Sequence, residues 1–167
     1  MYDELTEVDV KKMQEEIDYR IRVLRPKLIE DVQTARAFGD LSENFEYKCA
    51  KQEKNRNDSR IRYLEKMIKT ARVISVEAAE DSVGLFDKVV VYHEKLGREM
   101  TMRIVTTLRA DAGKGLISKE SPVGKALLGR KVGERVHVKV SDDVQYDMEV
   151  RSIEKGEDDA SLEIRRY

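Results

Sequence analysis

Two long stretches of this chain carry apolar residues at steps of three and four, the spacing that lines one face of an α-helix. The first runs over residues 8–36 and the second over residues 45–73. Each apolar stripe is narrow, so each helix needs a partner to bury it. Because the connection is short, we expect an antiparallel coiled-coil hairpin. The stripes consist of Val10, Met13, Ile17, Ile21, Leu24, Leu28, Val32 and Ala35, and of Tyr47, Ala50, Ile61, Leu64, Ile68 and Ala71.

Pro26 lies inside the first stripe. A proline there removes one backbone hydrogen bond and clashes with the preceding turn. The stripe continues beyond it, which predicts a kink or break and not an end. An antiparallel register that sets Leu64 near Ile17 also sets Asn57 near Arg25, and polar residues near the seam fix register at a cost in stability.

After about residue 77 the pattern changes to β-branched, partly alternating runs that are typical of strands. One segment, residues 121–129, reads instead as a short helix with Ser121 as its cap, Pro122 at its first position and Gly129 at its end. The sequence therefore predicts an α+β chain, with a hairpin over residues 1–76 and a small antiparallel sheet with one short helix over residues 82–167. The expected strands are residues 86–94, 98–107, 134–140, 145–154 and 161–167.

Composition excludes several classes of protein. The net charge of the 167 residues is −1, which argues against a general polyanion binder. There is no apolar run of 18 residues, and the first ten residues lack the features of a signal peptide, so we expect no membrane span. Cys49 is the only cysteine, which excludes an internal disulfide and a thiolate metal site and suggests a reducing cytoplasm.

Charge is uneven along the predicted hairpin. Residues 48–72 hold nine basic and three acidic side chains, whereas residues 1–38 hold nine acidic and seven basic ones. A solvated coiled-coil face accounts for such a pattern. The alternative is an electrostatic track for a phosphate backbone.

The turn between the predicted helices, GDLSENFEY at residues 39–47, has three acidic residues and no basic one. One interpretation is structural: Gly39 ends the first helix with a positive φ, Asp40 caps the second, and Glu43 completes a capping box. The other is functional, because Asp40 and Glu43 carry hard carboxylate oxygens that suit Mg²⁺. No His or Cys lies nearby to close the site, so the ion would belong in part to another molecule.

Two segments resemble a known family. Residues 25–74, RPKLIEDVQTARAFGDLSENFEYKCAKQEKNRNDSRIRYLEKMIKTARVI, resemble the N-terminal coiled coil of the bacterial Gre transcript cleavage factors, with their G-D-L-x-E-N-x-E-Y tip. Residues 115–140, GLISKESPVGKALLGRKVGERVHVKV, resemble their C-terminal domain, an FKBP-like sheet and helix. Phe45 stands where the family usually has a small residue. We expect it to pack on the end of the hairpin, with contact to nucleic acid as the alternative.

The resemblance implies a transcription elongation factor that is not itself an enzyme and that we expect to be a monomer. Such a factor binds RNA polymerase at the rim of the secondary channel and stimulates cleavage of the backtracked nascent RNA 3′ end. Asp40 and Glu43 match the acids that help hold the second Mg²⁺ and its attacking water. By position, Asn44, Glu46 and Tyr47 match the rest of the tip, Lys48, Lys51, Arg56 and Arg60 could guide extruded RNA, and Glu120, Ser121 and Pro122 match the region at the polymerase rim.

Two other classes stay open. Relatives of the Gre factors can occupy the same channel and regulate or inhibit polymerase without cleavage. A plain coiled-coil adaptor or an FKBP-like prolyl isomerase is the second alternative. The isomerase is disfavoured because the second half lacks an aromatic-rich pocket: its aromatic residues are Phe86, Tyr92, Tyr146 and Tyr167.

Overall fold

The structure is a computed structural model that describes residues 4–39, 43–77 and 79–165 of the chain. These residues divide into two compact units. The hairpin unit is Val10–Ala71, and the sheet unit is the described part of Asp3–Asp9 and Arg72–Arg166. The sequence assigned residues 1–76 to the first domain, whereas residues at both ends of that range belong with the sheet.

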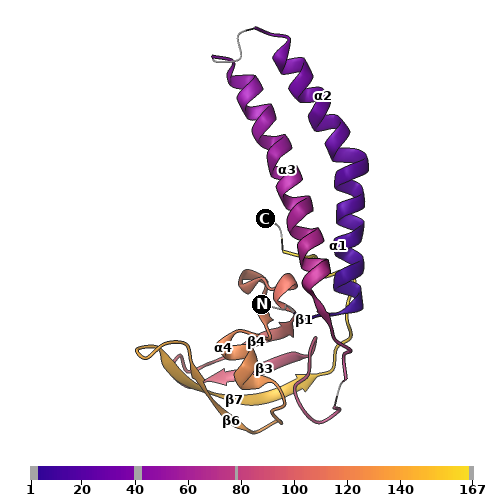
Figure 1. Cartoon of the computed structure of the whole chain (residues 1–167). Coiled ribbons are helices and arrows are strands. Elements are labelled where there is room, and N and C mark those ends of the chain that lie inside the picture. The colour runs from indigo at the N-terminus through magenta and orange to yellow at the C-terminus, as the bar shows by residue number, and fades with distance from the viewer. Residues whose placement is uncertain (1–3, 40–42, 78, 166–167) are drawn as a thin grey trace. The chain divides into compact units, whose positions relative to one another are not determined.

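Two antiparallel arms form the hairpin unit (Figure 1). The first arm consists of α1 (Glu7–Tyr19), a π-helical segment η1 (Arg20–Leu24) and α2 (Arg25–Arg36), and the second is α3 (Phe45–Thr70). The predicted irregularity near Pro26 is present as this π-helical segment. The Arg25 N–H bonds to the Arg20 carbonyl five residues earlier, and Pro26 follows directly after this wider turn.

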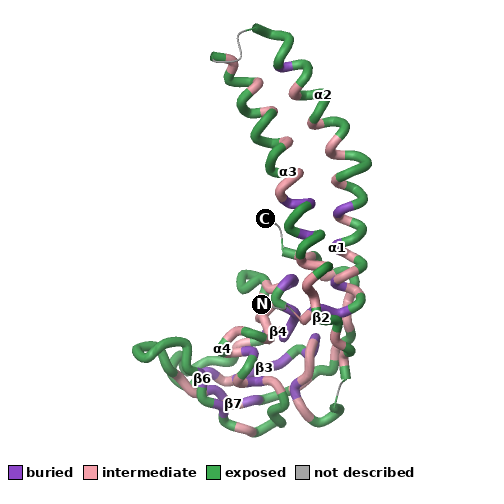
Figure 2. The backbone as a smooth tube through the Cα atoms, in the orientation of Figure 1, coloured by how far each residue is buried: buried purple, intermediate pink, exposed green. Residues whose placement is uncertain are grey.

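The seam of the hairpin is apolar over part of its length. Figure 2 shows that buried residues are sparse along the two arms and that most of the hairpin surface is exposed. The buried apolar residues of this unit lie on the predicted stripes, as amphipathic helices require. They are Met13, Ile17, Ala35, Ile61 and Leu64.

A polar cluster occupies the middle of the seam. The Glu16 carboxylate accepts hydrogen bonds from Arg20 at 2.7 Å and from Arg60 at 2.9 Å, and Arg20 donates to the Asn57 side chain at 3.0 Å. Burial acts to raise the pKa of Glu16, but the hydrogen bonds from Arg60 and Arg20 outweigh it and hold that pKa below its usual value. Asn57 therefore bonds to Arg20, whereas Arg25, which the sequence register set near Asn57, pairs with the adjacent Asp58 at 3.1 Å.

The sheet unit is built on five strands in the order β5-β4-β3-β7-β6. All neighbouring pairs are antiparallel except β4 and β5, so the sheet is mixed where the sequence predicted a purely antiparallel one. The last expected strand covered residues 161–167, and no strand forms over its described part, residues 161–165. There the Arg165 N–H bonds to the Leu108 carbonyl at 2.6 Å. The strands are β3 (Lys88–His93), β4 (Arg98–Val105), β5 (Leu116–Ser118), β6 (Arg135–Lys139) and β7 (Gln145–Glu154).

A second, two-stranded pairing joins distant parts of the sequence within the sheet unit. Strand β1 (Glu4–Leu5) pairs in parallel with β2 (Arg72–Val73), Glu4 opposite Arg72 and Leu5 opposite Val73. Lys119 binds the Glu4 carboxylate as well. The short β1 is thus held by residues that follow it by more than sixty positions.

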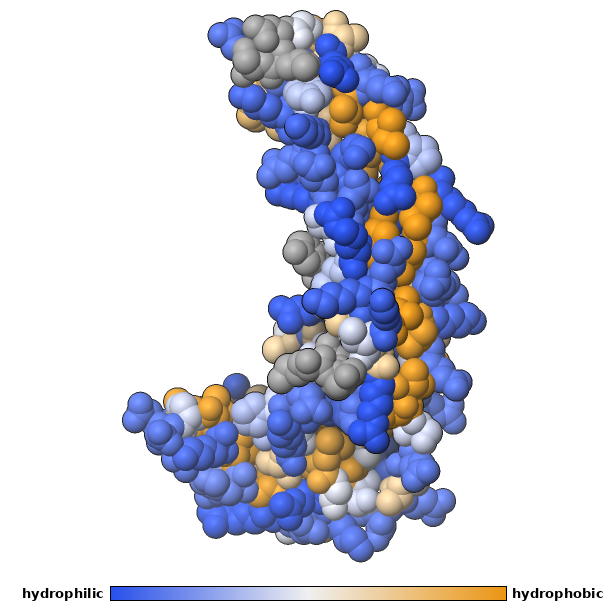
Figure 3. All heavy atoms as spheres, in the orientation of Figure 1, coloured by the Kyte–Doolittle hydropathy of each residue, from blue (hydrophilic) through white to orange (hydrophobic). Residues whose placement is uncertain are grey.

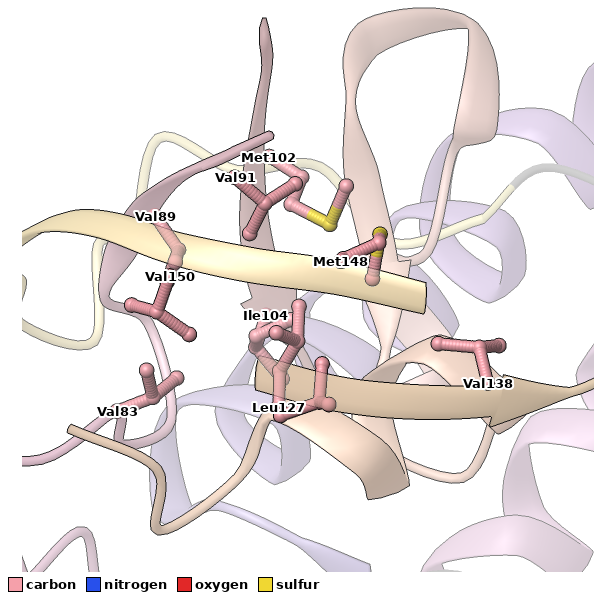
Figure 4. Close-up of a cluster of buried hydrophobic side chains, with 10 residues drawn as sticks. Val83, Val89, Val91, Met102, Ile104, Leu127, Val138, Met148 and Val150 are labelled. Carbon is pink, nitrogen blue, oxygen red and sulfur yellow. The ribbon is translucent and has the colours of Figure 1, made fainter. Parts of the chain in front are cut away.

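The core of the sheet unit lies between the sheet and α4 (Pro122–Leu127). Figure 4 shows Leu127 of this helix directed at side chains from β3, β4, β6 and β7. The predicted helix is confirmed in detail: the Ser121 hydroxyl accepts from the Gly124 N–H at 3.0 Å, and Gly129 follows with φ of +78°. The buried members of the core are Val83, Val89, Val91, Met102, Ile104, Leu127, Val136, Val138, Met148 and Val150.

A buried arginine connects three segments of the sheet unit. Arg109 ends the 3₁₀ turn η2 (Thr107–Arg109), shortly before a second such turn, η3 (Ala112–Lys114), and its side chain is fully buried. Its guanidinium donates to Asp9 at 2.5 Å and to the Asp159 carbonyl at 3.0 Å, and it lies 2.6 Å from an Asp158 carboxylate oxygen. Paired and hydrogen-bonded in this way, a buried charge is tolerated.

Among the described residues, no helix combines the length and the apolar character that crossing a membrane requires.

Candidate functional site at the hairpin turn

The first arm ends with α2 at Arg36, close to where the sequence predicts. Ala37 is the C-cap of α2, and Gly39 has a φ of +132°, a conformation that glycine adopts without a side-chain clash. Asp40, the first acidic residue of the turn, lies outside the described residues together with Leu41 and Ser42. The geometry of the turn is therefore described from Glu43 onward.

Asn44 is the cap of α3. Its side-chain oxygen accepts from the Tyr47 N–H at 3.0 Å, and its side-chain amide donates to the Ala35 carbonyl of α2 at 2.7 Å. One side chain thus starts the second arm and ties it to the end of the first. The capping box of Asp40 and Glu43 is wrong as a description of this helix start, because α3 begins at Phe45 and Glu43 precedes the cap.

Replacing Asn44 by alanine should lower the free energy of unfolding of the hairpin by about 1–2 kcal/mol, since both a cap and a link between the arms are lost. Urea unfolding followed by helical circular dichroism measures the change. Asn55→Ala is the matched control, because Asn55 is exposed in the interior of α3. Alanine there should be neutral or slightly stabilising. Equal effects of the two substitutions would contradict the role of Asn44.

Two carboxylates are exposed around the cap. Glu43 is exposed and makes no hydrogen bond or ion pair with the described residues. Glu46 is exposed in the first turn of α3, where a negative charge suits the helix dipole. No group of three or more His, Cys, Asp or Glu among the described residues is placed to hold a metal ion. The oxygen of Glu43 is nevertheless a donor of the kind Mg²⁺ takes, on a side chain that no described partner restrains.

Basic side chains continue along one face of α3 from the turn. Lys48 and Lys51 are exposed, Lys51 lies 5.9 Å from the centre of the Tyr47 ring, and Arg56 forms an exposed ion pair with Glu53 at 3.0 Å. This face, called the basic strip below, lines a shallow depression of about 440 Å³. The strip consists of Lys48, Lys51, Gln52, Asn55, Arg56 and Ser59.

Arg60 does not belong to that exposed face, which corrects the sequence assignment. Its side chain is only 5% exposed, its guanidinium binds Glu16 of α1 through two nitrogens at 2.9 and 3.3 Å, and it lies 5.5 Å from the Tyr63 ring. A buried, fully engaged arginine is part of the seam. The sequence could not distinguish it from its exposed neighbours because a basic residue on a helix carries no sign of its partner.

Phe45 was expected to pack on the end of the hairpin, and that expectation is wrong. Its side chain is 76% exposed, and Phe38 at the end of the other arm is 72% exposed. On the face shown in Figure 3, hydrophilic side chains cover much of the hairpin, with hydrophobic ones gathered in a line along it. The two phenylalanines are the most exposed large apolar side chains in the described part of the chain.

The second predicted site, in the sheet unit, lies at the start of α4. Glu120 is exposed and lies 3.3 Å from Lys125, Ser121 is the half-buried cap, and Pro122 is exposed at the first helical position. The three residues lie in succession at one rigid corner, because the Ser121 hydroxyl donates to the Ser118 carbonyl at 2.7 Å while it accepts from Gly124.

Two family models match this chain, one over each of two successive parts of the sequence. The family model described as "Transcription elongation factor, N-terminal" matches residues 4–73, and "Transcription elongation factor, GreA/GreB, C-term" matches residues 78–155. The chain is 46% identical to transcription elongation factor GreA of Thermoanaerobacter pseudethanolicus, covering 81% of this chain and 87% of that one. It is 38% identical to the protein of the same name from Mesoplasma florum, covering 89% and 96%.

Among solved structures, the GreA factor homolog 1 (Gfh1) protein of Thermus thermophilus is 24% identical over 93% of this chain and 100% of that chain, with a TM-score of 0.42. The assignment to a family therefore rests on the sequence matches and not on this structural similarity. Because two family models in succession cover most of residues 4–155 and relatives share 38–46% identity over most of both chains, the chain belongs to the GreA/GreB family of transcription elongation factors.

Proposed function

We propose that this chain binds RNA polymerase at the rim of its secondary channel and stimulates cleavage of backtracked nascent RNA by the polymerase. The observation that carries the proposal is that the Glu43 carboxylate in the turn is exposed and has no structural role among the described residues. Asn44 supplies the helix cap, so Glu43 is left exposed and free of structural bonds to the described residues. A carboxylate that makes no bond with the described residues, at the turn of the hairpin, is available to another molecule.

Asp40 and Glu43 are the residues that would hold Mg²⁺, shared with the active site of the polymerase. The donor set fits such an ion, because Mg²⁺ is commonly held by one or two carboxylates while water and phosphate complete its coordination. When bound, the ion supplies Lewis-acid stabilisation of charge on a reacting phosphate. The task of this chain is to deliver the carboxylates and to keep them oriented, which the double hydrogen bonding of Asn44 supports.

The remaining residues have supporting tasks in this proposal. Tyr47 lies half-buried at the base of the turn and Glu46 lies beside it, so both support the tip. Lys48, Lys51 and Arg56 present positive charge to the extruded RNA. The corner at Glu120, Ser121 and Pro122 would contact the polymerase rim, and its fixed geometry suits a docking surface.

The test is release of RNA 3′ fragments from a defined backtracked elongation complex in the presence of Mg²⁺. Adding the protein should speed release well above the intrinsic rate of the polymerase. Binding to the same complexes, immobilised on a sensor surface, is measured in parallel. Binding without faster release would contradict the cleavage role and would favour a regulator that fills the channel, whereas no binding would overturn the proposal as a whole.

A further inference from the structure

Phe45 is exposed beside a surface that suits a single-stranded polyanion. Isolated exposed apolar side chains are common and need no explanation. Phe45 differs because of its neighbours: Lys48, Gln52 and Arg56 follow it by three, seven and eleven positions along α3. Residues at these spacings share one helix face. The ring therefore lies at the turn end of the basic strip, next to the depression of about 440 Å³ that the strip lines.

Glu43 precedes α3, and the acidic residues nearest the start of the helix itself, Glu46 and Glu53, lie on a different face from the strip. Glu46 follows Phe45 by one position and Glu53 by eight, spacings that place both to one side of the strip. Glu53 also pairs with Arg56 at 3.0 Å, whereas Lys48 has no ion pair with the described residues. Positive charge is thus available near the ring, although the whole chain carries a net charge of −1.

An exposed ring at the end of a row of cations matches the chemistry of a nucleic acid strand with unpaired bases. Proteins that bind single strands combine cations that follow the phosphates with aromatic rings on which bases stack, and stacking tolerates any base. A duplex would not suit this surface, because its bases are already stacked on one another. Among the charged polymers, single-stranded RNA is therefore the occupant that uses both the ring and the strip.

We propose that Phe45 is a stacking platform for a base near the 3′ end of single-stranded RNA whose phosphates lie along Lys48 and Lys51. The inference deepens the proposed function and rests on it for the source of the RNA, the extruded end of a backtracked transcript. It assigns to Phe45 the task of holding that end near the acidic turn.

The test uses RNA with 2-aminopurine at its 3′-terminal position, a base whose fluorescence falls when it stacks. One arm mixes a short single-stranded RNA with the full-length protein at low salt. The other arm uses a backtracked elongation complex with Mg²⁺ withheld, so that the RNA stays intact. In both arms, the protein concentration for half-maximal quenching is measured for wild type and for three variants: Phe45→Ala, Phe45→Trp and Phe38→Ala.

Phe45→Ala should raise that concentration about tenfold, equivalent to about 1.4 kcal/mol, which lies within the range for base–aromatic stacking. Phe45→Trp should quench at least as well as wild type. Phe38→Ala is the matched control: it removes an equally exposed phenyl from the other arm and should change the value by less than about twofold. Because both rings are exposed, neither alanine variant should unfold the hairpin, which circular dichroism checks.

The outcomes separate this inference from the proposed function. Quenching of the short RNA that depends on Phe45, with no binding to polymerase, would keep the stacking site and overturn the proposed function. Polymerase binding with no quenching in either arm would overturn the stacking site alone. Equal losses in Phe38→Ala and Phe45→Ala would also overturn it, since the effect would then belong to the whole turn.

Discussion

Replacing Asp40 by asparagine and Glu43 by glutamine together should slow Mg²⁺-dependent release of RNA 3′ fragments by about 10²-fold or more. Each substitution keeps the size of the side chain and removes the negative charge that would hold the ion. A correctly held metal ion contributes several kcal/mol to such a reaction, and about 1.4 kcal/mol corresponds to a tenfold change in rate. Polymerase binding should not change, because the sheet unit carries the proposed rim contact.

The control for this variant is Glu30→Gln with Asp31→Asn. These two acids are exposed and adjacent on α2, so the control makes the same pair of chemical changes in the hairpin but away from the turn. It should release RNA at the wild-type rate. Because Asn44 and not Glu43 caps α3, the tip variant should also keep its helical circular dichroism. Wild-type release from the Asp40 and Glu43 variant would remove the metal-holding role from the turn.

Replacing Arg109 by alanine should lower the free energy of unfolding of the sheet unit by about 3–5 kcal/mol. The substitution leaves Asp9 buried without its cation and removes the charge beside Asp158. Breaking a buried ion pair by removing one partner costs that much because the other charge stays in the interior. Urea unfolding followed by hydrogen exchange of the β3 amides measures the change in the unit that contains Arg109.

Arg98→Ala provides the comparison for Arg109. Arg98 is an exposed arginine at the start of β4 in the same unit, and its loss should change stability by no more than about 0.5 kcal/mol. If Arg109→Ala were as mild as Arg98→Ala, the buried network would contribute little to the fold. Asp9→Asn offers a second check. It removes the negative charge that pairs with Arg109 and should also lower the free energy of unfolding of the sheet unit.

Local patterns were sufficient to predict the main elements. The three-and-four spacing of residues such as Met13 and Ile17 identifies the arms because burial on one face requires that period. Alternation identifies β7, whose observed bounds, Gln145–Glu154, equal the predicted ones. The helix that begins at Pro122 could also be predicted from the sequence, because the order of cap, proline and terminal glycine is typical of a helix start and end.

Contacts between residues that are far apart in the sequence could not be predicted from it. Asp9 and Arg109 are 100 positions apart, and nothing local to either residue marks the pair. The two-residue strands β1 and β2 are too short to show a period. At the turn, Asp40 with Glu43 fits a capping box as well as Asn44 fits a cap, so the pattern alone could not say which residue starts the helix. Exposure of Phe45 was missed for a related reason, since an aromatic residue beside a helix start can point either inward or outward.

The parallel pairing of β1 with β2 has a consequence for the order in which this chain can fold during synthesis. Residues 4–9 emerge from the ribosome before the hairpin, yet their partners at Arg72, Arg109 and Lys119 are made much later. The segment between them, the hairpin, has its own contacts and can form as soon as α3 is complete. Residues 4–9 therefore stay without these partners while the hairpin folds, and they join the sheet unit only when the sequence beyond the hairpin has been made.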